Sequence, residues 1–204
     1  MLRLSFVTGT EPGKWLRRYE AGTSHGLAAS GSDDPLAELA AGEADLALAR
    51  LPDDRVGSGH HVVRLYDETP GVAVPKDSVY AEVGEAVRRD DLEGEIVNFT
   101  YTPGMTAEKA EQLRGALQVV AANVGVAYAP RPLLKVLSKK QVVPLELLDA
   151  EAAPTTVALV WDKSADSEAI QDFVGVAKGR TLNSSRVARP AEKESGKKRR
   201  RKRR

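Results

Sequence analysis

The sequence predicts an α/β fold followed by a disordered carboxyl-terminal tail, and three observations lead to that prediction. Short apolar runs rich in β-branched residues alternate along the chain with segments whose apolar residues recur at helical spacing. Glycine, proline and aspartate separate most of these segments. The apolar pattern stops beyond Thr181. Strands that alternate with helices are typical of an α/β sheet with parallel strands.

The first half of the chain begins with a strand. Residues 2–7, LRLSFV, have strand character and end at the turn TGTEPG of residues 8–13. Apolar residues within 15–19 have helical spacing and predict the first helix. Residues 22–32 are rich in Gly, Ser and Ala and predict a loop or a frayed strand. The remaining elements are a helix at 35–41, capped by Asp33 or Asp34, with Pro35 in its first turn and ended by Gly42, and strands at 44–49, 61–66 and 71–74.

The second half continues the alternation. Residues 85–89 predict a short helix, and EIVNFTY at 95–101 predicts a strand. Thr106 is the expected N-cap of a helix that runs to about residue 122. TTVALVW at 155–161 is a strongly β-branched strand. The remaining elements are a strand at 124–128, a helix at 130–140, a strand at 142–147, and a last helix capped by Ser164 or Asp166 and ended by Gly179.

The charge of the chain is unevenly distributed. The 204 residues contain 30 Lys and Arg against 29 Asp and Glu, a formal charge of +1. Residues 193–204 hold nine basic residues and one acidic residue, a charge of +8, and residues 1–192 hold 21 basic and 28 acidic residues, a charge of −7. Residues 182–204 contain too few apolar side chains to offset the entropy of ordering, so we expect a disordered basic tail. An acidic body with a basic tail favours interaction with polyanions.

The composition excludes several classes of protein. The chain has no cysteine, and therefore no disulfide framework, thiolate zinc site or cysteine nucleophile. No apolar run approaches the roughly 20 residues of a membrane helix, and the amino terminus lacks the apolar region of a signal peptide. We therefore expect a cytoplasmic protein without a membrane partner.

Neither metal binding nor catalysis has a strong candidate. The histidines are His25, His60 and His61, and the last two point to opposite faces of a strand, which makes them a poor chelate. The sequence contains no HExxH, GxSxG or Walker motif. The adjacent acids at 53–54 and 90–91 lie in turns, where we expect them to be solvated. We expect no catalytic residue, no metal and no cofactor.

Two turns rich in hydroxyl groups have the chemistry of a binding site. In VTGTEPG, Thr8 and Thr10 flank Gly9 after the first strand and before a helix. Ligands of open α/β sheets lie outside the carboxyl ends of the strands, and the amino end of a helix favours anions. FTYTPG repeats the arrangement with Thr100, Tyr101 and Thr102. Two such turns facing each other across a cleft would suit a carboxylate or another small anion, while the alternative is that the threonines only cap the turns.

The tail is the other candidate for binding. Its last eight residues are all basic: Lys197, Lys198, Arg199, Arg200, Arg201, Lys202, Arg203 and Arg204. Such a run attracts DNA or RNA through phosphate contacts without regard to sequence, and its binding weakens with salt. It contains no aromatic residue for stacking on bases. A purely solubilising tail remains the alternative.

The order of the motifs resembles that of a known family. The matching segments lie at 2–19, 33–52, 62–81, 91–95, 119–133 and 157–174, and the most specific are GEADLALARLP and VAANVGVAYAPRPL. In this order they are similar to the effector-binding, or substrate-binding, domain of LysR-type transcriptional regulators. The resemblance covers nearly all of residues 1–178.

The resemblance implies two α/β lobes joined by two crossover strands, as in type 2 periplasmic binding proteins. Lobe I would comprise residues 1–70 and 157–181, and lobe II residues 71–156. An effector would lie between the lobes, against the two hydroxyl-rich turns, with Val124 and Gly125 closing the floor. The resemblance therefore implies a non-enzymatic, effector-binding protein in transcriptional regulation.

The chain departs from the family pattern in four places. We expect no helix-turn-helix and no linker helix, with which family members begin, because no segment of residues 1–204 matches them, and the basic tail is not part of the pattern. Residues 96–122 are short by a helix and a strand, which leaves the contacts of lobe II to a ligand open. Residues 20–32 are less apolar than the usual second strand of the dimer surface, which leaves a homodimer open. The alternative function is an accessory protein that docks a partner, such as a regulator, and has a vestigial cleft.

Overall fold

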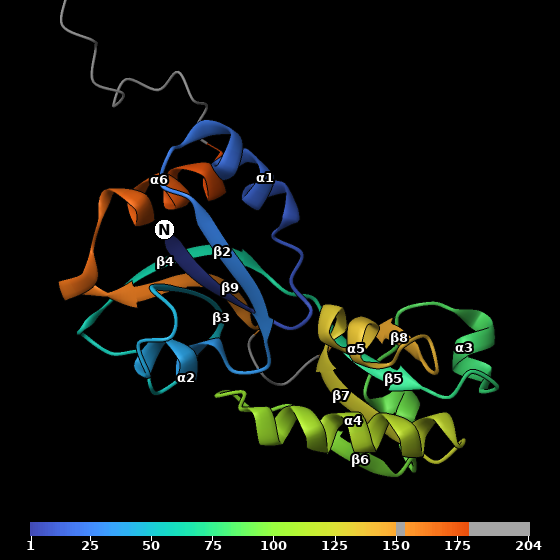
Figure 1. The fold of residues 1–204 in the computed structure, drawn as a ribbon. Helices are drawn as coiled ribbons and strands as arrows, with labels where there is room; N and C mark the ends of the chain where they lie inside the picture. Colours follow the sequence, from blue (N-terminus) through green and yellow to red (C-terminus); the bar gives the residue numbers. More distant parts are fainter. Residues whose placement is uncertain (150–153, 180–204) are drawn as a thin grey trace, which may run out of the picture.

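The structure is a computed structural model, and it describes residues 1–149 and 154–179. The described chain forms two sheets, each with its own helices, and we call them lobe I and lobe II (Figure 1). The chain passes from lobe I to lobe II at residues 68–69 and returns through residues 147–155, of which 150–153 are outside the described part. The basic tail that the sequence predicts also lies outside the described residues.

Lobe I contains a five-stranded sheet in the order β2-β1-β3-β9-β4. All six residues of β3 are buried, as expected for the central strand of a covered sheet. Helices α1 and α6 pack against one face and α2 against the other (Figure 1). The elements are β1 (Leu2–Val7), α1 (Gly13–Gly22), β2 (Leu27–Ser32), α2 (Pro35–Ala40), β3 (Leu46–Leu51), β4 (His60–Asp67), β9 (Thr156–Asp162), the 3-10 helix η2 (Lys163–Ala165) and α6 (Glu168–Ala177).

Lobe II contains a four-stranded sheet in the order β6-β7-β5-β8. Helices α4 and α5 cover one face of it, where Leu113, Leu117 and Leu134 are buried. The segment from α3 to η1 covers the other face. The elements are β5 (Pro70–Val74), α3 (Val79–Val83), the 3-10 helix η1 (Asp90–Leu92), β6 (Val97–Thr100), α4 (Ala107–Ala121), β7 (Val126–Pro130), α5 (Arg131–Leu137) and β8 (Val143–Glu146).

The sheets are mixed, whereas the alternation of elements predicts parallel strands. Parallel pairing holds for β1 with β2, β1 with β3, and β6 with β7. Strand β9 is antiparallel to β3 and β4, and β5 is antiparallel to β7 and β8. The reason is the double crossover: the chain enters lobe I again from lobe II, so β9 runs back against the strands beside it. The prediction of an α/β fold with two lobes is confirmed.

Local signals place most element ends correctly. The Asp34 side chain accepts from the backbone N–H of Ala37 and caps α2. The Thr106 hydroxyl accepts from the N–H of Lys109 and caps α4. The last helix has a different cap, because Ser167, rather than Ser164 or Asp166, accepts from its first turn.

Two predicted elements differ in the structure. The short helix predicted at 85–89 is wrong: the helix lies earlier, between its cap Ser78 and the left-handed Gly84, and Val87 forms an isolated β-bridge with Leu147. The glycine- and serine-rich segment forms the regular strand β2, which among the described strands pairs only with β1 and is largely exposed. A strand at a sheet edge needs little apolar surface. The low apolar content of this segment therefore wrongly predicts a loop or a frayed strand. Within the described residues, no helix is long and apolar enough to cross a membrane.

Candidate ligand site between the lobes

The first hydroxyl-rich turn lies at the carboxyl end of β1 and holds a carboxylate of the chain itself. The Thr8 hydroxyl donates to Oδ1 of Asp33 at 2.7 Å and also lies 3.2 Å from the carbonyl oxygen of Ser32. The Thr10 hydroxyl is buried and donates to the carbonyl oxygen of Val7 at 2.7 Å, so it closes the turn. The first threonine thus faces an anion, and the second has the capping role that was the alternative.

Gly9 brings the two lobes into contact. Its φ of +93° favours glycine, and a Cβ atom built there would lie 2.8 Å from the Arg50 guanidinium and 3.1 Å from the Cα atom of Leu133 in α5. These contacts are tighter than most real Cβ contacts, and the φ is one that side chains rarely adopt, so glycine favours the close approach of the β1 turn to lobe II at this point.

The second hydroxyl-rich turn lies at the carboxyl end of β6. Thr100 and Thr102 are exposed, and Tyr101 is half-buried. Burial raises the pKa of Tyr101 to about 12, so its phenol stays protonated at neutral pH. The Thr102 hydroxyl accepts from Nζ of Lys109, which also donates to two carbonyl oxygens of the same turn. This lysine therefore ties the turn to the first turn of α4.

The structure does not bring Val124 and Gly125 to these turns. Both residues precede β7, and Gly125 packs on the backbone of Ile96, which precedes β6. Strands β6 and β7 are parallel, so this is the amino end of the pair, whereas Thr100 ends β6. Four strand residues separate the two ends by about 13 Å. The φ of +62° and the close contact with Ile96 give Gly125 a structural role.

Two arginines that the sequence analysis missed join the lobes. Arg114 in α4 donates to both carboxylate oxygens of Asp33, at 2.7 and 2.9 Å. Arg55 donates to the carboxylates of Asp34 and Asp53 and, at 3.1 Å, to the carbonyl oxygen of Met105 in lobe II. We call these groups the charged seam: Asp33, Asp34, Asp53, Arg55, Met105 and Arg114.

The charged seam also corrects one expectation. The adjacent acids at 53–54 are not both solvated, because Asp53 is buried and paired with Arg55 while Asp54 is exposed. Burial raises the pKa of the Asp53 carboxyl, but the hydrogen bonds from Arg55 outweigh burial, and the pKa lies below its usual value. The Asp53 carboxylate is therefore ionised at neutral pH.

Little space remains beside the charged seam. The cavity that Val7, Asp34, Arg50 and Met105 help to line has a volume of only about 10 Å³. That is about the minimum for one water molecule. The lobes in this structure are therefore closed on each other at the charged seam, and a ligand could enter there only if they separate.

A buried ion pair lies behind the charged seam, where the chain crosses between the lobes. Arg50 donates to both carboxylate oxygens of Glu68, at 2.6 and 2.9 Å, and to the carbonyl oxygen of Thr8 at 2.7 Å. Thr155 donates to the same carboxylate at 2.8 Å. Each charged side chain is 1% exposed. Since Glu68 and Thr155 belong to the two crossover segments, this cluster fixes both segments to β3.

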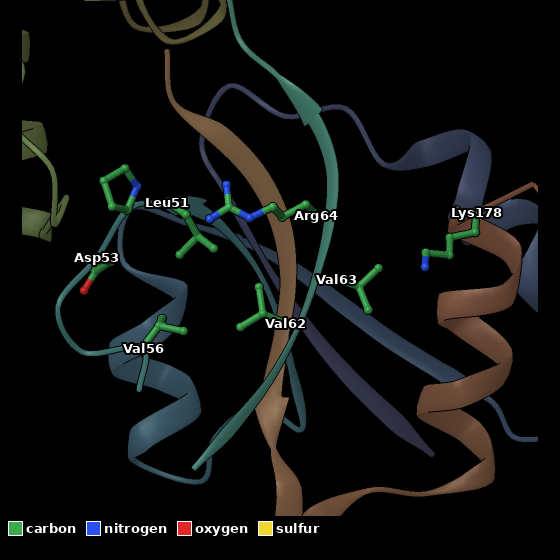
Figure 2. A pocket seen from close by; sticks show the side chains of 8 residues that line it. Leu51, Asp53, Val56, Val62, Val63, Arg64 and Lys178 are labelled. Carbon is green, nitrogen blue, oxygen red and sulfur yellow. The ribbon is translucent and has the colours of Figure 1, made fainter. Parts of the chain in front are cut away.

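Two larger hollows lie elsewhere on the surface. One is a groove of about 720 Å³ between α1, α5 and the first crossover. The other lies along the free edge of β4, entirely within lobe I. Figure 2 shows Val62 and Val56 on the α2 side of this strand and Val63 and Lys178 on the α6 side. Because only lobe I residues line this second hollow, the affinity of a ligand bound there would not depend on the separation of the two lobes.

The histidines do not gather into one site. His25 lies 3.1 Å from a carboxylate oxygen of Asp172, His60 accepts from the N–H of Gly57, and His61 packs on Trp161. The described residues contain no group of three or more His, Asp or Glu side chains that could hold a metal ion.

Comparisons with known proteins agree with this architecture. Residues 22–181 match the family model described as the LysR substrate binding domain. A search of curated proteins gave no match. Solved structures with the same fold include the reduced form of OxyR from N. meningitidis, with a TM-score of 0.61, 16% identity, and coverage of 89% of this chain and 96% of that one.

Two further structures have effector or DNA bound. The BenM effector binding domain with its effector benzoate has a TM-score of 0.63 and 17% identity over 87% of this chain and 90% of that one. Full-length CbnR complexed with its target DNA has a TM-score of 0.61 and 14% identity over 88% of this chain and 69% of that one.

The fold therefore defines a two-lobed, periplasmic-binding-protein-like domain of the kind found in transcriptional regulators. The chain belongs to the LysR substrate-binding domain family.

Proposed function

We propose that this chain is a non-enzymatic effector-binding domain that holds a small organic anion between its lobes. One observation carries the proposal: Thr8 from lobe I and Arg114 from lobe II bind the same carboxylate, that of Asp33. The lobe boundary therefore already has a donor set for a carboxylate, contributed by both lobes. In the BenM domain the effector is benzoate, which is also a carboxylate.

The proposed mechanism is an exchange of carboxylates. When the lobes separate, Arg114 leaves Asp33, and a ligand carboxylate takes the place of the aspartate. A ligand shifts the lobes only by its different affinity for the open and closed states. Asp33 is the internal competitor of the ligand, because it occupies the donors that the ligand needs.

The charged seam is suited to binding rather than to proton transfer. Asp33 is paired with Arg114, and Asp34 and Asp53 with Arg55. A carboxyl group whose pKa is held low, as that of Asp53 is, makes a poor general acid at neutral pH. We therefore assign no reaction to the charged seam.

Calorimetric titration with benzoate and succinate tests the exchange. Asp33→Asn removes the competitor and should bind at least one of the two acids more tightly, by about threefold to tenfold. Arg114→Met removes the donor and should weaken binding by about tenfold. The matched controls are Asp77→Asn and Arg17→Met, which change exposed residues away from the charged seam. Equal affinities of all five proteins, or no binding of any acid tested up to solubility, would contradict the proposal.

We propose that residues 197–204 add a non-specific affinity for nucleic acid. With up to eight phosphate contacts, log K should fall with log salt at a slope of about −5 to −7. A gel-shift titration with random-sequence DNA measures this, and deletion of 193–204 should abolish the shift. If the truncated chain shifted DNA as well as the full chain, the tail would have no such role.

The closed seam favours a second candidate function. A seam with a cavity of only about 10 Å³ beside it, and with its donors paired internally, is also what a vestigial site would have. In that case the chain is an accessory module that docks a protein partner, such as a full-length regulator. Capture of one defined regulator by the tail-deleted chain, unchanged in Arg114→Met and in the presence of acids, would support this function against effector binding.

A further inference from the structure

The groove between α1 and α5 lies on the other side of the β1 turn from the charged seam. In Figure 1 the chain after β1 passes beside α5, with α1 above this contact and α2 and the segment before α4 below it. Gly9 lines the groove and packs on the backbone of Leu133, so the lobes are in contact between the two places. The groove is therefore a separate hollow at the same lobe boundary.

The groove has aromatic and apolar walls from both lobes. Lobe I and the first crossover contribute Trp15, which is half-buried, and Tyr66, which is 42% exposed. Lobe II contributes Pro132 and Val136, one turn apart on α5, and Val136 is 45% exposed. The volume of about 720 Å³ falls in the range of pockets for small molecules.

Charged groups stand on both sides of the groove. Arg131 and Lys135 are also one turn apart on α5 and share the face that lines the groove. Arg131 is held by the carbonyl oxygen of Pro144, at 3.1 Å from its Nε atom. Glu11 stands on the lobe I side. Within the described residues, the side chains of Lys135 and Glu11 have no hydrogen-bond or ion-pair partner.

We infer that this groove is a second small-molecule site, which takes a zwitterionic amino acid with an aromatic side chain. The carboxylate binds Arg131 and Lys135, the ammonium group binds Glu11, and the ring packs between Trp15 and Val136. A plain carboxylate would leave Glu11 unpaired. An amine would leave Lys135 unpaired, whereas Arg131 already lies 3.9 Å from a carboxylate oxygen of Glu146. Only a ligand with both an ammonium group and a carboxylate pairs with the charged groups on both sides of the groove. These two sides belong to different lobes.

Titration calorimetry of the full chain with three matched ligands tests the inference. L-Tryptophan has both charged groups, indole-3-propionate lacks the ammonium group, and tryptamine lacks the carboxylate. We expect tryptophan to bind most tightly, indole-3-propionate more weakly and tryptamine most weakly. Equal affinity of tryptophan and tryptamine, or no binding of any of the three up to solubility, would overturn the inference.

Single substitutions test the cationic side and the acidic side of the groove separately. Lys135→Met should weaken tryptophan and indole-3-propionate by about tenfold or more and leave tryptamine unchanged. Glu11→Gln should remove the advantage of tryptophan over indole-3-propionate. The matched controls are Lys76→Met and Glu20→Gln, whose residues are exposed and outside the groove. Equal binding by variants and controls would show that the ligand binds elsewhere and would overturn the site.

The inference is independent of the anion site proposed at the charged seam. Arg114→Met should weaken benzoate or succinate and leave the affinity for tryptophan unchanged. If the acids fail to bind and tryptophan binds as described, the groove stands and the exchange at Asp33 falls. If tryptophan binding also falls with Arg114→Met, the two places are one site and the inference is overturned.

Discussion

The buried ion pair between Arg50 and Glu68 should respond very differently to single and to double substitution. Glu68→Gln keeps the size of the side chain but removes the charge that faces the guanidinium. Both side chains are 1% exposed, so no water can replace the lost carboxylate. Arg50 keeps only its bond to the carbonyl oxygen of Thr8 as a strong partner.

The structure gives the expected magnitude. Two charge-assisted hydrogen bonds are weakened, and an uncompensated charge stays buried, which costs about 3–5 kcal/mol of unfolding free energy. In a chain of this size, 1 kcal/mol corresponds to about 2–4 °C in Tm, so we expect a loss of about 6–20 °C. Arg50→Met with Glu68→Met removes both charges and should stay within about 1–2 kcal/mol of the unmodified chain, because apolar pairs replace buried ion pairs at little cost.

Urea unfolding followed by tryptophan fluorescence measures these differences. Trp161 lies buried in β9, in the hydrophobic core of lobe I, and reports its unfolding. The midpoints should shift at nearly constant m-value. Thr155→Val is an intermediate case, since it removes one hydrogen bond to Glu68 and should cost about 1 kcal/mol. A loss below about 1 kcal/mol in Glu68→Gln, or a double variant as unstable as the single one, would refute the reasoning.

Three further predictions follow from single positions. Gly125→Ala should destabilise the chain by more than about 2 kcal/mol in the same urea assay, because its Cβ atom would lie 2.0 Å from the carbonyl oxygen of Ile96. Gly115→Ala, in open space on α4, should instead stabilise the chain by about 0.5–1 kcal/mol. Equal effects of the two substitutions would contradict the close contact at Gly125. Tyr101 should ionise near pH 12 in an absorbance titration, later than the other tyrosines, and Tyr101→Phe should remove that last step. Because the pKa of Asp53 is lower in the folded chain than in the unfolded chain, its carboxylate stabilises the fold at any pH above the unfolded pKa of about 4, and this stabilisation is lost as the pH falls through the folded pKa. Asp53→Asn should therefore flatten the acid side of a curve of unfolding free energy against pH. An unchanged acid side would show that Asp53 makes no such contribution.

The sequence could predict the elements whose signals are local. The caps at Asp34 and Thr106 and the β-branched run of β9 act within a few residues, and the structure confirms each of them. Where the prediction failed, at 85–89, no residue caps a helix, and the segment takes its conformation from a bridge to Leu147 in a distant part of the chain. The strand β2 similarly owes its order to pairing with β1.

Some residues of the candidate site could likewise be predicted from the sequence, and others could not. The sequence predicts Thr8 as a ligand-binding residue, because a hydroxyl at the carboxyl end of a strand is a local feature, and in the structure this hydroxyl donates to the carboxylate of Asp33. The sequence does not predict Arg55 and Arg114, since nothing near them in the sequence marks them as ligand-facing. The pairing of Arg114 with Asp33 joins residues 81 positions apart, and no spacing rule reaches that far.

By itself, the sequence determined the α/β fold and the family, because these depend on residue patterns in short segments. The tertiary structure decided the direction of β9, the burial of the Arg50–Glu68 pair and the closure of the cleft by the charged seam. These features depend on which faces meet when two lobes pack. That outcome is set by the summed packing of residues far apart along the chain rather than by the conformational preference of any one segment.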